Sequence, residues 1–267
     1  MALSDNLILL LDQLAKSQSE IRMLNIYKGL PITCDTSIHS VGEFEIRVPS
    51  SKQQIACLYH QRETFLHGEN LPFLIRSQVI SLNLDKEEAV LSNFEVAKSD
   101  IGKRAQIRVE PEESLISFIQ FVGLTYDIPA PLADISAEGA SIYLDTLQYS
   151  SRLFQPGNEI SITISFSDTL SQKIKKLNTK ALTESRISKP MPRPNASMRP
   201  DGNVIITSRG KITSVHQEPR LDRYRIGMRL YFQDLARMVI LQYLSQRQSE
   251  IIRDLRILSE ELYSRKR

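Results

Sequence analysis

The 267-residue sequence has little of what marks several common classes of protein. Its two cysteines, Cys34 and Cys57, stand in apolar segments without CxxC spacing, which predicts reduced buried thiols rather than a disulfide or metal site. Its four histidines are scattered, so we expect no metal centre. The longest apolar run, residues 7–11, is far too short to span a membrane, and the N-terminus lacks the pattern of a signal peptide. These absences predict a soluble cytoplasmic protein.

The sequence also lacks a strong charge bias. Lysine and arginine total 34 against 31 for aspartate and glutamate, a formal net charge of +3. This balance is too even to indicate nucleic-acid binding unless a local cluster does so. With 41% hydrophobic and 24% charged residues the composition is globular, and the length suits two modest domains. No Ser-His-Asp or paired-carboxylate grouping stands out, so we do not expect an enzyme.

Residues 1–97 are expected to form a β-rich domain with a leading helix. Ser4 and Asp5 are favourable at a helix N-terminus, and apolar residues recur at helical spacing from Leu3 to about Met23. The apolar stripe of this helix is expected to pack on its own domain, with a partner protein as the alternative.

The rest of this domain has the residue pattern of strands. Polar residues at 85–88 suit a hairpin turn between the strands expected at residues 73–84 and 89–96. The pattern predicts a small antiparallel sheet or barrel, and the polar stretch that follows marks a domain boundary. The expected strands are residues 44–48, 55–59, 73–84 and 89–96.

An interdomain linker is expected at residues 98–108, and a second antiparallel barrel at 109–232. Its short segments are rich in valine, isoleucine, tyrosine and phenylalanine and are separated by proline, glycine and aspartate. The expected strands are residues 104–109, 115–122, 140–144, 159–166, 204–215 and 224–232.

A basic insertion at residues 173–200 interrupts the strand spacing of this barrel. Glu184 is its one acidic residue against eight lysines and arginines, and four prolines crowd its second half. This composition is typical of a solvated loop. Contact with an acidic partner or with nucleic acid is the functional alternative, although interleaved aromatic residues are lacking.

Residues 233–267 are expected to form a long C-terminal helix. Leu244, Ile251 and Leu258 repeat every seven residues, with a companion seam at Leu241, Leu255 and Leu262. The stripe can pack along the protein's own barrel or against a second copy of the chain. Its length favours the second copy, so a homo-oligomer is expected.

Two short motifs carry the functional prediction. The first is Lys103-Arg104-x-x-x-Arg108, whose guanidinium groups can grip phosphate or a guanine edge. The second is Asp134-x-Ser136-x-x-Gly139, with a carboxylate, a hydroxyl and a glycine suited to positive φ at a turn. A ligand with guanine and phosphate would use all these groups, because a carboxylate accepts from guanine N1–H and N2–H.

This pair of motifs resembles the bipartite signature of the PilZ domain, a bacterial receptor module for cyclic di-GMP. The resemblance covers roughly residues 103–250 and continues in Ile226-Gly227-Met228-Arg229-Leu230, similar to the closing strand of that domain. The β-rich domain before it resembles the N-terminal domain of flagellar-brake proteins. The fold implied is mainly β, with two small antiparallel β-barrel domains, the second six-stranded, an N-terminal helix and a long C-terminal helix.

The resemblance also implies roles for the motif residues. Arg104 and Arg108, with Lys103 beside them, would grip guanine and phosphate groups of cyclic di-GMP. Asp134 and Ser136 would line the guanine pocket, and Gly139 would shape the turn.

The function implied is that of a cyclic di-GMP receptor without a cofactor. It would change its domain arrangement to regulate a protein partner, in motility or biofilm behaviour. That partner would be the flagellar motor or another effector target, with recruitment to a membrane-associated complex. The rival hypothesis is a nucleic-acid-binding or scaffold protein that uses the basic insertion and the C-terminal helix.

Overall fold

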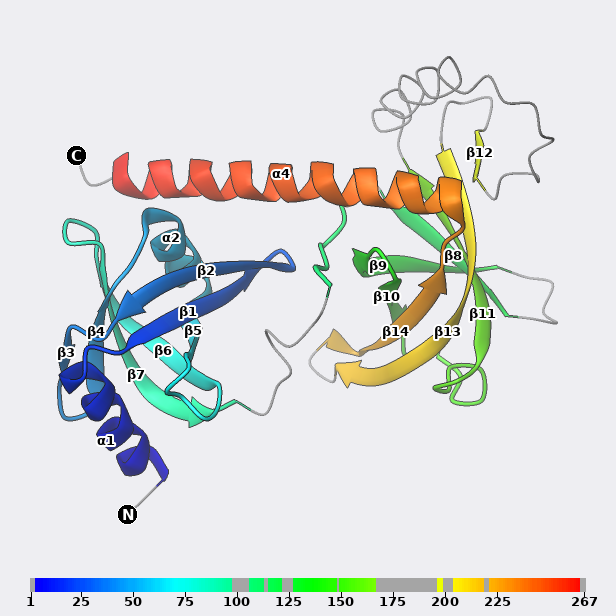
Figure 1. Ribbon diagram of the computed structural model, residues 1–267. Coiled ribbons are helices and arrows are strands. Elements are labelled where there is room, and N and C mark those ends of the chain that lie inside the picture. The colour runs from blue at the N-terminus through cyan, green and yellow to red at the C-terminus, as the bar shows by residue number, and fades with distance from the viewer. Residues whose placement is uncertain are drawn as a thin grey trace. The chain divides into compact units, whose positions relative to one another are not determined.

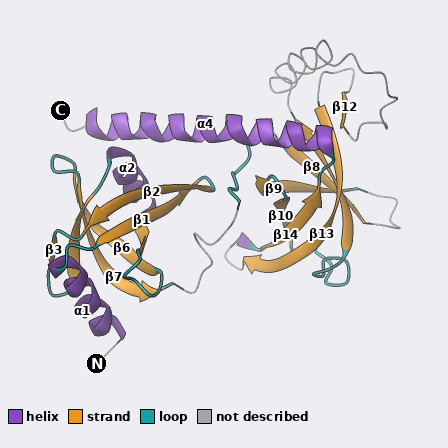
Figure 2. Cartoon of the chain, viewed as in Figure 1, coloured by secondary structure: helices purple, strands orange, loops and turns teal. Residues whose placement is uncertain are grey.

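The computed structural model describes residues 3–97, 106–112, 115–121, 127–147, 149–166, 196–198, 204–218 and 221–264 (Figure 1). The chain divides into two compact units, Met1–Ala105 with Ser249–Arg267, and Gln106–Gln248. Strands predominate in both units (Figure 2). The division between Ala105 and Gln106 falls inside the range expected to be a linker.

The first unit contains an antiparallel sheet in the order β2-β1-β5-β6-β7-β4-β3, curled but open between its edge strands β2 and β3 (Figure 1). A turn before Glu88 joins β6 and β7, which confirms the expected hairpin. The strands are β1 (Glu20–Tyr27), β2 (Leu30–Ser37), β3 (Ser40–Val41), β4 (Glu45–Pro49), β5 (Glu63–His67), β6 (Ile75–Asn83) and β7 (Glu88–Val96).

Helix α1 (Leu3–Lys16) contributes the stripe of leucines expected from the sequence. Leu7, Leu11 and Leu14 are buried against the sheet, in the core cluster of this unit. The prediction that the helix continues to Met23 was wrong, because β1 begins at Glu20. Ile21 and Met23 are buried on the same face of that strand, so the alternation of a strand replaces the helical period there.

Residues 55–59, expected as a strand, lie in helix α2 (Lys52–Gln61). Ser51 caps this helix, since its hydroxyl oxygen accepts a hydrogen bond from the backbone N–H of Gln54 at 3.2 Å. Arg62 ends it with φ of 58°. The strand prediction was wrong because a short apolar run does not distinguish a buried strand from a buried helix. The Ser51-x-x-Gln54 spacing is the capping signal that identifies the helix.

The second unit contains a sheet in the order β11-β8-β9-β10-β14-β13-β12, in which β11 also pairs with β13. This extra pairing closes the ring formed by β8, β9, β10, β14, β13 and β11, which confirms the expected antiparallel barrel. The strands are β8 (Ile116–Phe121), β9 (Ile128–Ser136), β10 (Gly139–Asp145), β11 (Glu159–Phe166), β12 (Ala196–Met198), β13 (Val204–Glu218) and β14 (Arg223–Tyr231).

Strand β9 was not among the strands expected from the sequence, because it contains two prolines. Pro129 and Pro131 are two residues apart, so both lack an N–H on the same side of the strand. In this stretch β9 pairs with β8, whereas its pairing with β10 begins at Leu132. Prolines are tolerated where one side of a strand has no ladder partner. The start of β9 meets this condition.

The expected strand at residues 104–109 was also wrong in its described part. Residues 106–108 are not in a strand, and Val109 forms a single bridge to Ile135. The basic insertion at residues 173–200 lies outside the described residues except for Ala196–Met198, which form β12.

Helix α4 (Asp234–Ser264) agrees with the expected C-terminal helix. Its residues up to Gln248 belong to the second unit, and those from Ser249 belong to the first. Leu244, Ile251 and Leu255 of its apolar stripe are buried within the protein's own chain. Self-association through this stripe therefore stays a prediction that the fold does not require. In the described part of the chain, no helix has the length and apolarity needed to cross a membrane.

Candidate functional site

The segment that carries Arg108 is fixed to the barrel by backbone hydrogen bonds. Val109 donates its N–H to the carbonyl of Ile135 at 3.0 Å and accepts from the N–H of Ile135 at 3.0 Å. Next to it, the carbonyl of Glu110 accepts a hydrogen bond from Nε of Arg247 in α4 at 2.9 Å. Arg108 therefore lies beside β9 without being part of a strand.

The carboxylate of Asp134 is the centre of the site. Asp134 lies on β9 and is 3% exposed. Arg108 Nη1 donates to its Oδ1 at 3.2 Å and to Ser141 Oγ at 3.4 Å, and Arg225 Nη2 of β14 donates to its Oδ2. A buried carboxylate is stable only when its charge is paired and hydrogen-bonded, and here each oxygen has its own arginine.

The electrostatics of Arg225 agree with this pairing. Burial lowers the pKa of its guanidinium, whereas the charge of Asp134 and the hydrogen bond to it raise that pKa. Tyr143 and Glu218 raise it further, so the net pKa lies above the ordinary value for arginine. Arg225 is therefore a permanent cation of the site.

Two guanidinium groups share one carboxylate, which leaves an excess positive charge. The side chains of Arg108 and Arg225 remain 32% and 36% exposed, whereas that of Asp134 is 4% exposed. Each guanidinium has five N–H donors, so both have donors left for an anion. The arrangement can thus hold a phosphate, and the carboxylate can accept from a guanine edge if an arginine exchanges partners.

Ser136 and Gly139 flank the turn between β9 and β10, at Ala137 and Glu138. Ser136 is buried, and its hydroxyl donates to the carbonyl of Gly139 at 3.1 Å. Gly139 does not adopt positive φ, so the expected reason for glycine was wrong. A Cβ at Gly139 would lie 2.3 Å from the carbonyl oxygen of Met228 on β14, and this close approach of the backbone requires glycine.

The structure therefore places Asp134, Ser136 and Gly139 on the outer face of β9 and β10, and Arg108 contacts Asp134 from the segment beside β9. Lys103 and Arg104, the other residues of the predicted site, lie outside the described residues.

Solved structures of several proteins align with most of the chain. They include the complex of K. pneumonia MrkH with c-di-GMP, at 11% identity and a TM-score of 0.42, covering 94% of this chain and 96% of that one. Bacillus subtilis MotI/DgrA, an inhibitor of motility, aligns at 12% identity and a TM-score of 0.38, covering 86% of this chain and 96% of that one. Escherichia coli YcgR in complex with c-di-GMP aligns at 12% identity and a TM-score of 0.31, covering 97% of this chain and 94% of that one.

No family model matches the chain. No curated protein matches it either.

Arg225 and Ser141 are residues of the site that the two motifs do not contain. Arg225 is 91 positions from Asp134 in the sequence, and β10 lies between their strands. Sequence spacing cannot pair two residues so far apart. The alternation of β14 gives one signal, since Ile226 and Met228 read as core and Arg225 must then face outward.

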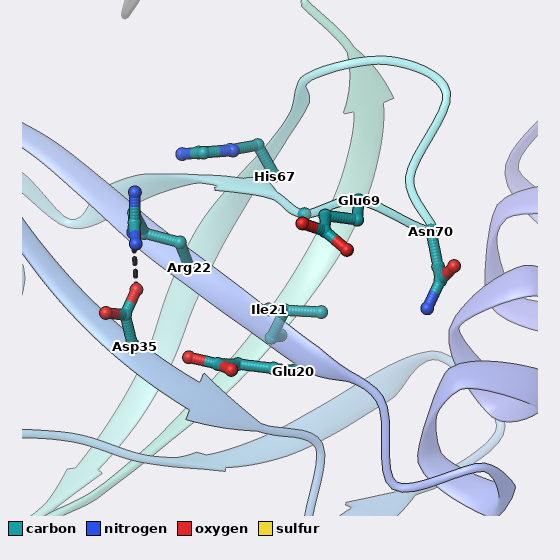
Figure 3. Close-up of a pocket in the computed structure, with 8 residues that line it drawn as sticks. Glu20, Ile21, Arg22, Asp35, His67, Glu69 and Asn70 are labelled. Atoms are coloured by element: carbon teal, nitrogen blue, oxygen red, sulfur yellow. Dashed lines mark hydrogen bonds and ion pairs between the residues drawn. The ribbon is translucent and has the colours of Figure 1, made fainter.

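The first unit has a separate polar pocket of about 520 Å³. Figure 3 shows Arg22 paired with Asp35 on one side of it and His67, Glu69 and Asn70 around the rest. Burial lowers the pKa of His67, and so does the charge of Arg22. Glu20 also lines the pocket, so its carboxylates outnumber its one arginine. This charge balance does not suit a phosphate ligand.

Proposed function

We propose that this protein is a receptor for cyclic di-GMP. The observation that carries the proposal is the buried carboxylate of Asp134 held between Arg108 and Arg225. A guanine nucleotide presents paired N–H donors on its base edge and anionic oxygens on its phosphate. The site offers the complement, with one carboxylate for the base edge and two guanidinium groups for phosphate.

Arg108 has a double role in this proposal. In the structure it donates to Asp134 and Ser141, and both contacts hold its guanidinium above the outer face of the barrel. Such a fork is arranged before the ligand arrives, so less side-chain entropy is lost on binding. Arg104, four residues earlier in the sequence, is proposed to supply a second fork to the same ligand.

The receptor is further proposed to act by changing its domain arrangement and so regulating a protein partner in motility or biofilm behaviour. A ligand can shift such an equilibrium only by its differential affinity for the two arrangements. Small-angle X-ray scattering with and without cyclic di-GMP measures that shift. Identical scattering curves at saturating ligand would sink this part of the proposal and leave the binding claim intact.

Thermal unfolding with two cyclic dinucleotides tests the ligand assignment. A ligand that binds only the folded state raises the melting temperature in proportion to its occupancy and affinity. We expect cyclic di-GMP to raise it and cyclic di-AMP to do so much less. The rival hypothesis of nucleic-acid binding predicts the opposite pattern, with no shift by either dinucleotide and strongly salt-dependent binding to generic DNA or RNA.

A further inference from the structure

The outer face of the barrel carries a second pair of cations beside the site. Lys211 of β13 and Arg229 of β14 are directly opposite each other in the strand register. Both side chains are exposed, and Arg229 is also directly opposite Gly139 of the predicted site. Two like charges opposite each other on neighbouring strands destabilise a sheet. This pair therefore does not stabilise the sheet, whereas an anion bound near Lys211 and Arg229 would offset their repulsion.

These cations lie on the same face as Asp134. On β14, Ile226, Met228 and Leu230 are buried in the barrel, so Arg225, Gly227 and Arg229 face outward. The neighbours of Gly227 in the register are Ser141 on one side and Ser214 on the other, and Asp134 is the next residue beyond Ser141. The register thus forms one cross-strand row, with a floor of small residues at Ser141, Gly227 and Ser214.

Arg229 stands one row along the strand from this floor. Two residues of a strand span about 7 Å, which an extended arginine side chain can bridge. Arg225 stands one row away in the other direction, where it is opposite Tyr143. The small floor is therefore bordered by Arg225 on one side and by Arg229 with Lys211 on the other. Large side chains are absent from the described floor itself, so a flat ligand can lie across it.

The nearby acidic groups do not neutralise this pair. Lys211 lies 3.6 Å from Glu159, but both side chains are exposed, at 49% and 67%. An exposed ion pair of this kind contributes little to stability, so Lys211 can exchange Glu159 for a bound anion. Among the described residues, Arg229 has no carboxylate within ion-pair distance.

We infer that Lys211 and Arg229 form a second phosphate subsite, so that the ligand extends from Asp134 across Gly227 and places one phosphate at each end. This inference rests on the proposed function and deepens it. A ligand with two phosphate groups satisfies both ends, whereas a mononucleotide reaches only one. The subsite explains why the repelling pair lies in the same cross-strand row as Gly139, the glycine of the predicted motif.

The test is isothermal titration of cyclic di-GMP into the full chain and into the double variant Lys211→Gln, Arg229→Gln. Hydrogen bonds to charged groups are strong enough that we expect roughly a tenfold loss of affinity or more. The salt dependence of binding should also become weaker, because fewer charges attract the ligand. Arg209→Gln is the matched control, since Arg209 is exposed on β13, two residues farther along the strand from Lys211, and is opposite Tyr231. Its affinity should be unchanged.

Melting temperatures without ligand separate a binding role from a structural one. Removing two like charges should leave the melting temperature of the double variant unchanged or raise it slightly. A lower melting temperature together with weaker binding would assign the pair a structural role and overturn the inference. Wild-type affinity in the double variant, or an equal loss in the Arg209→Gln control, would also overturn it. If the unmodified protein does not bind cyclic di-GMP, the proposed function itself fails.

Discussion

Arg225 of β14 holds the carboxylate of Asp134 of β9, although strand β10 lies between them. This ion pair ties together three neighbouring strands of the barrel on their outer face. It also pairs a carboxylate that is almost completely buried, with Arg108 as the second partner. The same contact therefore serves the stability of the barrel and the chemistry of the site.

Replacing Arg225 by alanine should destabilise the protein by about 1–3 kcal/mol, because Asp134 would stay buried with one cation instead of two. The free energy of unfolding in urea measures this loss. Lys211→Ala is the matched control in the same barrel, since its ion pair with Glu159 is exposed and worth at most about 1 kcal/mol. Equal effects of the two substitutions would contradict the structural role of Arg225.

Asp134→Ala should reduce the preference for guanine more than it reduces binding of phosphate. The carboxylate accepts from guanine N1–H and N2–H, and adenine lacks this pair of donors. The ratio of the affinities for cyclic di-GMP and cyclic di-AMP, measured by titration, should therefore fall. Asp145→Ala, on the exposed end of β10, is the control and should leave the ratio unchanged. Equal losses for both dinucleotides in Asp134→Ala would count against this role.

Gly139→Ala should lower the stability of the unliganded protein. Its new Cβ would be 2.3 Å from the backbone oxygen of Met228, which can move away only if two strands separate. We expect a loss of about 1–3 kcal/mol, as for other overpacked sites. In Gly227→Ala the Cβ would meet the hydroxyl of Ser214 at 2.5 Å, and that side chain can rotate, so the loss should be smaller. The reverse order of melting temperatures would show that this reason for Gly139 is wrong.

The two cysteines should differ in reactivity. Burial raises the pKa of the Cys57 thiol to about 12, so at pH 8 it is almost entirely protonated and unreactive. Cys34 is partly exposed. A thiol reagent such as Ellman's should therefore titrate one thiol in the folded protein and two in urea. Rapid reaction of both thiols without denaturant would contradict the burial of Cys57.

Much of the fold could be predicted because long apolar patterns agree with the final elements. The strand expected at residues 159–166 is β11 without any shift, and the helix expected at residues 233–267 is α4, which begins at Asp234 and is described to Ser264. In both segments the local pattern and the burial in the fold indicate the same structure. Strand β9 was missed because its prolines oppose the local pattern, and pairing with β8 overrides them.

The candidate site could be predicted only in part. Asp134 and Ser136 were singled out from their spacing, but the strand β9, on which both lie, was not expected. Arg225 could not be found from spacing, because the register of β9, β10 and β14 is what brings it close to Asp134. Contacts between residues far apart in the sequence depend on the closed barrel, which local spacing does not encode.

Isothermal titration with cyclic di-GMP is the decisive experiment for the proposed ligand site. We expect saturable binding to the unmodified protein and a loss of at least about a hundredfold in affinity in the Arg104→Ala, Arg108→Ala double variant, since two charged hydrogen-bonding groups are removed. Arg237→Ala, an exposed arginine on α4, should bind as the unmodified protein does. Unchanged affinity in the double variant, or no binding by the unmodified protein, would contradict the proposed function.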